Sequence, residues 1–261
     1  MIETFRNAWR VPELRKKLLF TFFIIIIYRV GGTVPVPYLD SVALSAWFEQ
    51  SASSGDFFSY LNVLSGGNFS KATLLALSVS PYINAQIIIQ LLTYALPPLE
   101  RLQKEGPEGR KKLNKITKYA SLAIAIFQAW AYYLTMKKAG ACVYTEGFSK
   151  IFAEIVIIAC FTAGASLTIW LGDEINEKGI GNGISMLLFA GIIARGPSAV
   201  IGLFDYMKTG EAKNIILVIA ILVVFVLMIG FIIFMNEAER RIPIQYAKRV
   251  VGRKQYGGQN T

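Results

Sequence analysis

Histidine is absent from the 261 residues of this chain, and cysteine occurs only at Cys142 and Cys160. The commonest metal ligand and physiological proton shuttle is therefore missing. One cysteine lies in a polar connection and the other inside an apolar run, a placement that disfavours a disulfide, and neither has metal-ligand spacing. We expect no cofactor, no metal site and no redox chemistry, and we predict that both thiols are inert.

Charged residues are also scarce, at 17%, and they lie between long apolar runs. Apolar residues make up 54% of the chain, and the mean hydropathy is +0.47. A helix that crosses a bilayer needs about 20 predominantly apolar residues, because lipid offers backbone groups no hydrogen-bond partner. This length predicts six membrane-spanning helices, at residues 18–36, 72–96, 116–136, 151–171, 183–203 and 214–235.

The first apolar run follows Arg15, Lys16 and Lys17, as the core of a signal peptide would. No small-residue cleavage site comes after it, and five more runs do, so we expect a retained helix.

Acidic residues number only 17 against 27 Lys and Arg, which gives a formal net charge of +10. Such a charge could indicate a nucleic-acid partner, so the placement of the basic residues decides the interpretation. With the amino terminus in the cytoplasm, 19 of them fall in the cytoplasmic segments 1–17, 97–118, 172–182 and 236–261, and six fall in the opposite loops. This asymmetry predicts that both ends are cytoplasmic and that the charge mainly orients the protein.

A short apolar segment, residues 57–64, lies between the first two predicted spans and is followed by Gly66 and Gly67. It is too short to cross a bilayer, but it could form a helix of two or three turns that the glycines end. The segment could lie flat on the membrane as an interfacial helix, or it could be tucked into a cavity of the bundle.

The second predicted span is interrupted by polar residues and by Pro81. Proline removes a backbone donor and disfavours helical geometry at Ser80, so we expect a kink or a broken turn there. The polar side chains, which include Ser78, Asn84 and Gln86, could face a wet cavity or hydrogen-bond a neighbouring span.

Two apolar stripes recur at helical spacing: Val79, Ile83 and Ile87 in the second span, and Ile184 and Leu188 in the fifth. Periodicity alone is typical of lipid-facing or core positions. The glycine-rich stretch 178–185 that precedes the fifth span lacks the strand and the lysine of a nucleotide-binding loop. We interpret it as a tight turn with close helix packing.

The last 26 residues are polar and carry paired cations, among them Lys248 with Arg249 and Arg253 with Lys254. Such pairs could anchor the chain to anionic lipid, or they could dock phosphate-rich RNA or an acidic protein face. The sequence ends inside this segment, and we interpret the chain as incomplete.

Five motifs occur in order along the chain: LNVLSGG at 61–67, SPYINAQIIIQLLT at 80–93, KEGPEGRKK at 104–112, WLGDEI with GIGNGIS between 170 and 185, and RRIPIQYAKR at 240–249. In these motifs, essentially the whole chain resembles the bacterial SecY family of protein-conducting channels. The family fold implied is an all-α membrane channel of ten spans in two inverted halves. Residues 1–203 would be the first half, and residues 204–261 the sixth helix with a cytoplasmic docking loop.

The resemblance also implies roles for individual residues. It places the pore ring at Val79, Ile83, Ile184 and Leu188, and the lateral gate at Asn84, Ile87, Ile88 and Leu91. It places a plug at about residues 57–69, with Phe57, Phe58, Leu61, Val63, Leu64 and Phe69, and it places the docking site for SecA or the ribosome at Lys248, Arg249, Arg253 and Lys254.

The function implied is a passive, non-enzymatic conduit for secretory polypeptides in the bacterial cytoplasmic membrane, which releases membrane segments sideways into lipid. Its implied partners are SecE, SecG, SecA, the ribosome, signal sequences, translocating polypeptides, the bilayer and the missing carboxy-terminal half. A secondary transporter with inverted repeats is the alternative function, and it would need a specific polar site deep in the membrane. A membrane-embedded enzyme would need facing catalytic groups, and the sequence offers none.

Overall fold

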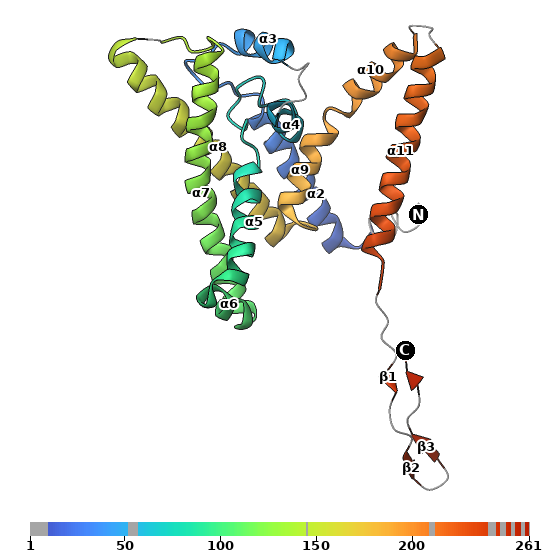
Figure 1. Cartoon of the computed structure of the whole chain (residues 1–261). Helices are drawn as coiled ribbons and strands as arrows, with labels where there is room; N and C mark the ends of the chain where they lie inside the picture. The colour runs from blue at the N-terminus through green and yellow to red at the C-terminus, as the bar shows by residue number, and fades with distance from the viewer. Residues whose placement is uncertain are drawn as a thin grey trace. The chain divides into compact units, whose positions relative to one another are not determined.

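The computed structural model describes residues 10–51, 57–144, 146–208 and 212–239, together with four short strands after residue 243. Most of these residues are helical, which confirms the predicted fold class. The chain divides into two compact units, Met1–Pro197 and Ser198–Thr261, which are described separately below (Figure 1).

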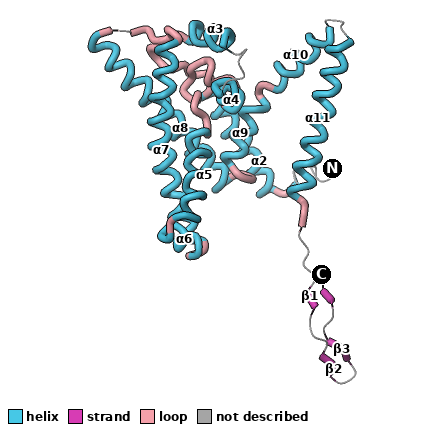
Figure 2. Tube along the Cα trace, viewed as in Figure 1, coloured by secondary structure: helices cyan, strands magenta, loops and turns pink. Residues whose placement is uncertain are grey.

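The first unit is a helical bundle in which α7 packs against α5 and α8, and α8 packs in turn against α2 and α9 (Figure 2). The short helix α6 joins α5 to α7 at one end of the bundle, and α4 packs against α9. The helices of this unit are α2 (Pro12–Gly31), α3 (Ser41–Ser51), α4 (Phe57–Leu64), α5 (Ser80–Ala95), α6 (Pro97–Lys104), α7 (Pro107–Lys138), α8 (Gly147–Lys178) and α9 (Gly183–Ile193).

The second unit contains α11 (Ala212–Asn236) and most of α10 (Gly196–Lys208). Its carboxy-terminal part holds two small antiparallel ladders, in which β1 (Ile244–Gln245) pairs with β4 (Gln259–Asn260) and β2 (Arg249–Val251) pairs with β3 (Lys254–Tyr256). These strands are the exception to the all-α prediction among the described residues.

Three helical stretches in the described part of the chain are long and apolar enough to cross a membrane: Gly147–Lys178, Gly183–Lys208 and Lys213–Asn236. They correspond to the fourth, fifth and sixth predicted spans, so the predicted number of six is not confirmed. The helices at the first three predicted spans are too short or too charged to be counted with these three. α2 begins with charged residues that include Glu13 and Lys16, α5 has only 16 residues, and the first turns of α7 are strongly basic.

The second predicted span is helical only from Ser80 onward, so the expectation of helix from residue 72 was wrong. The expected break at Ser80 is confirmed, because α5 begins at that residue and Pro81 occupies its first turn. The preceding residues run as successive turns, and Ala72 and Ser78 adopt positive φ angles of 47° and 50°.

The backbone before α5 obtains its hydrogen bonds from the chain that follows α2. Leu74 donates to the carbonyl of Val34 at 2.8 Å, and Val36 donates to that of Ala72 at 3.1 Å. This pairing explains why α2 ends at Gly31 instead of continuing to residue 36, since the paired residues must be extended.

Two apolar clusters form the core of the first unit. The Phe69 cluster joins α3, α7, α8 and the segment after α4, and the Val79 cluster joins α2, α5, α8 and α9. The buried members of the Val79 cluster are Ile24, Tyr28, Leu75, Val79, Leu171, Ile175, Ile184 and Leu187.

Candidate functional site: an apolar constriction

All four residues of the predicted pore ring lie in the Val79 cluster. Val79 is 1% exposed and precedes α5 directly, and Ile184 is buried in the first turn of α9. Ile83 and Leu188, one turn further along each helix, are half-buried and pack against the cluster. The structure therefore brings together two stripes that lie about a hundred residues apart in the sequence.

The turn before α9 holds Ile184 against the cluster. Asn182 caps the helix by accepting a hydrogen bond from the Ser185 backbone at 3.3 Å, and Asn176 accepts one from Gly183 at 2.7 Å. A Cβ atom on Gly183 would fall on the carbonyl oxygen of Gly172 in α8. The predicted tight turn with close helix packing is confirmed.

The predicted plug forms the two-turn helix expected from its sequence, α4, and Gly66 and Gly67 follow it with φ angles of 69° and 91°. This end of the segment lies directly on α9, because a Cβ atom on Gly66 would approach the Gly191 carbonyl oxygen to 2.6 Å. Leu61 and Leu64 are half-buried, whereas Val63 is exposed. The segment is packed against the bundle, which favours the cavity over an interfacial helix.

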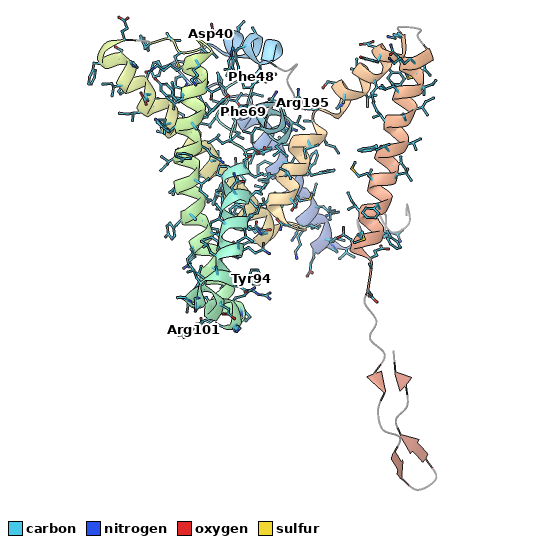
Figure 3. The ribbon with its side chains drawn as sticks, viewed as in Figure 1. Asp40, Phe48, Phe69, Tyr94, Arg101 and Arg195 are labelled. Carbon is cyan, nitrogen blue, oxygen red and sulfur yellow. The ribbon has the colours of Figure 1, made fainter. Side chains whose placement is uncertain are left out.

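The side chains of Phe57 and Phe58 lie outside the described residues. Phe69 occupies a different environment from the rest of the predicted plug. Its ring stacks on Tyr132 of α7 with the centroids 4.1 Å apart, and it meets Phe48 of α3 edge-on at 5.5 Å (Figure 3). The Tyr132 hydroxyl donates to the Phe69 carbonyl. Phe69 therefore anchors the segment at its carboxyl end, with only 2% of its surface exposed.

The predicted gate residues share the exposed face of α5. Asn84, Ile87, Ile88 and Leu91 are all exposed, and the buried residues of this helix, Pro81, Ala85 and Thr93, lie on its opposite side. Three large apolar side chains on one open face form a strip along which an apolar helix could pack.

The predicted docking residues are only partly described. Lys248 and Arg253 lie outside the described residues, and Arg249 and Lys254 lie in β2 and β3, whose side chains are not described.

Two contacts of the site were not predicted from the sequence. Arg29, near the end of α2, donates to the carbonyls of Ala190 and Gly191 in α9, the second at 3.3 Å. The hydroxyl groups of Tyr28 and Ser78 form a hydrogen bond of 2.9 Å, so the polar side chain of Ser78 is linked to α2. An arginine inside an apolar run was the available signal, because a charge in such a run needs a partner.

The arrangement offers an apolar cluster and little reactive chemistry. In the described part of the chain, no group of three or more potential metal ligands occurs. Both cysteines are free, and burial raises the pKa of the Cys142 thiol, which reduces its reactive thiolate fraction at neutral pH.

Comparisons with known proteins identify the family and the fold of this chain. The SecY family model matches residues 73–261. The protein translocase subunit SecY of Streptomyces coelicolor is 40% identical over 271 residues, which cover 100% of this chain and 61% of that protein. The chain thus spans about three-fifths of the length of such relatives.

Two solved structures share the fold. One is described as the structure of a protein-conducting channel, with a TM-score of 0.58, 20% identity and coverage of 93% of this chain and 52% of the other. The second is Sec61 in the canine ribosome-channel complex from the endoplasmic reticulum, with a TM-score of 0.56, 20% identity and coverage of 83% and 47%.

Proposed function

Because this chain belongs to the SecY family, we propose that it forms the first half of a protein-conducting channel in the bacterial cytoplasmic membrane. Unfolded secretory polypeptides pass through the channel, and apolar membrane segments leave it sideways into lipid. A carboxy-terminal half completes the pore wall and the second side of the gate. The channel performs no bond chemistry and needs no cofactor.

The observation that carries the proposal is the convergence of Val79, Ile83, Ile184 and Leu188 in one apolar cluster. Branched apolar side chains offer a passing polypeptide no hydrogen bonds, so they do not hold it. When no polypeptide is present, a narrow apolar ring excludes water and ions. The same four residues therefore suit both conduction and sealing.

The plug and the gate fit the same function. The segment from α4 to Gly67 rests on α9, the helix that carries half of the ring, and its displacement would clear the pore. The exposed strip of Ile87, Ile88 and Leu91 on α5 provides an apolar surface on which a signal sequence can lie before it enters lipid. A signal sequence that binds the open form better shifts the channel toward that form.

A secondary transporter is the alternative, and its substrate site would present polar groups at mid-membrane depth. The four ring residues are instead all aliphatic, and the polar pair of Tyr28 and Ser78 beside them is satisfied by its own hydrogen bond of 2.9 Å. This composition favours a conduit over a site that binds a specific small solute.

The function is tested with a photo-reactive amino acid placed at Ile83 or Ile88 in the assembled channel. A secretory precursor arrested during translocation should cross-link through its mature region to position 83 and through its signal sequence to position 88. Position 155 on the exposed face of α8 is the control and should give little product. Equal cross-linking at all three positions, or none at 83, contradicts a conduit through the ring.

We propose further that both chain ends are cytoplasmic, as the excess of basic residues in those segments favours. SecE and SecG would complete the membrane complex. SecA or the ribosome would dock on the loop that contains β2 and β3 and would drive polypeptides through the pore. The canine relative of this fold, which is described as part of a ribosome-channel complex, supports the ribosome as a partner.

Reversing two charges of the docking loop, with Arg253→Glu and Lys254→Glu, should weaken ribosome or SecA binding. Losing attraction and adding repulsion at two charged contacts should raise the dissociation constant about tenfold at low salt, and less as salt screens the interaction. Binding is measured over a range of salt concentrations. Lys137→Glu with Lys138→Glu, at the carboxyl end of α7, is the matched control. An unchanged affinity and salt slope would leave the loop as a lipid anchor.

A further inference from the structure

An open aromatic pocket lies at the start of α8, away from the predicted pore ring. Its volume is about 340 Å³, and it is lined by Tyr38, Tyr144, Phe148, Ser149 and Phe152. Four of these five residues are aromatic, and they come from three parts of the chain: the segment after α2, the segment after α7, and α8 itself.

Backbone pairing holds the pocket together. The segment around Leu39 pairs antiparallel with that around Cys142: Asp40 donates to Ala141 at 2.8 Å, and Val143 donates to Tyr38 at 3.1 Å. This pairing places the side chains of Tyr38 and Tyr144 side by side. Tyr38 has a φ angle of 67°, which is strained for a residue with a Cβ atom and is held here by its surroundings.

The aromatic rings of the pocket are inclined to one another. The Tyr38 ring lies 5.6 Å from that of Tyr144 at an interplanar angle of 58°, and 6.3 Å from that of Phe152 at 67°. Rings inclined in this way can surround a cation, because each ring has a partly negative face that attracts positive charge within about 6 Å.

The pocket is not part of the protein core. Phe148 is 82% exposed and Phe152 is 52% exposed. The formal charges of Glu146 and Lys150, which flank the start of α8, cancel, so attraction for a cation comes from the rings. The hydroxyl groups of Ser149 and the two tyrosines supply hydrogen-bond donors for an anionic group beside that cation.

The surface next to the pocket indicates which kind of molecule would bring a cation to it. α8 is one of the helices long and apolar enough to span a membrane, and the pocket lies at its first residues, where the headgroups of a bilayer begin. Below the pocket, Ile151 and Ile155 continue as exposed apolar side chains of the same helix. We propose that the aromatic pocket binds the ammonium headgroup of a zwitterionic phospholipid, whose acyl chains lie along this face of α8.

The test compares two lipids that differ only in their headgroup. Phosphatidylethanolamine and phosphatidylglycerol with identical acyl chains are titrated into the detergent-solubilised protein, and binding is followed by native mass spectrometry. The double variant Phe148→Leu with Phe152→Leu removes two ring faces, keeps apolar side chains and leaves the hydroxyl donors in place. It should bind phosphatidylethanolamine about tenfold more weakly, as expected for the loss of cation–π contacts, and phosphatidylglycerol as before.

Two further variants make the result interpretable. Phe127→Leu makes the same chemical change on an exposed face of α7 and should alter neither lipid's binding. Phe148→Leu changes a highly exposed side chain, so it folds even if the double variant does not, and it should also weaken phosphatidylethanolamine selectively. Equal weakening of both lipids would show a general apolar contact, and no weakening would show an unused pocket; either result overturns the proposal.

Discussion

Serine at both Ile83 and Leu188 should make the resting channel leak ions, with a conductance raised on the order of tenfold. These two residues are the half-buried members of the predicted ring, and each belongs to a different helix. A hydroxyl group is shorter than the side chain it replaces and binds water, so the double substitution both widens and wets the constriction. Serine has a helix propensity close to that of isoleucine and only slightly below that of leucine, so α5 and α9 should remain helical.

Leak is measured as ion flux across liposomes that contain the assembled channel without a precursor. Phe189→Ser is the matched control, because Phe189 lies on the exposed side of α9 next to Leu188 and outside the cluster. The flux of that control should equal that of the parent protein. If the double variant leaks no more than the control, these residues do not form the seal.

Gly183→Ala is expected to destabilise the protein strongly by overpacking. The added Cβ atom would overlap the Gly172 carbonyl oxygen, a backbone atom that cannot rotate away. The start of α9 would have to separate from α8, which should lower the free energy of unfolding by about 3 kcal/mol, the upper end for overpacking. Because Ile184 follows Gly183 directly, the same shift would disturb the ring.

Thermal unfolding in detergent, together with the ion-flux measurement, checks this expectation. Gly202→Ala makes the same change in α10, where nothing lies within 4 Å of the new Cβ atom. It should be neutral or stabilising by about 0.5–1 kcal/mol, as alanine is in a helix. If the two variants have equal stability, the contact between Gly183 and Gly172 does not restrict the packing of α9 on α8.

The sequence predicted those features that depend on local chemistry. Pro81 predicted the break at Ser80, Gly66 and Gly67 predicted the end of α4, and the glycines around 181 predicted the turn into α9. Each of these follows from the conformations that one residue type allows or forbids, so neighbouring residues were sufficient.

The features that were not predicted depend on partners far along the chain. The extended pairing of residues 34–36 with residues 72–74 removed helix from the ends of two predicted spans, although both segments read as apolar. Gly164 of α8 packs against the non-helical backbone at Leu74, a contact that joins residues far apart in the sequence. A hydropathy pattern indicates whether a segment lies in the membrane. It does not indicate which other segment supplies the partners for its backbone hydrogen bonds.

The candidate ring was recognised by resemblance, because its spacing alone is typical of any buried face. Convergence of Val79 and Ile184 in one cluster is information that only the fold supplies. The same holds for Phe69, which the sequence grouped with the plug and which the fold places against Tyr132.

The contacts of α2 also join segments of the chain that are synthesised at different times. Arg29 donates a hydrogen bond to the Ala190 carbonyl, 161 positions further along the chain, and the Thr21 hydroxyl accepts one from the Ile180 backbone, 159 positions further along. At a synthesis rate of about 5–20 residues per second, α2 waits roughly 8–30 seconds before its partners have been made. During that interval an arginine near the end of an apolar helix lacks the carbonyls of α9, at a cost of up to about 3 kcal/mol in lipid. The nascent chain must therefore be sheltered, either by water at the membrane surface or by the machinery that inserts it, until α9 emerges.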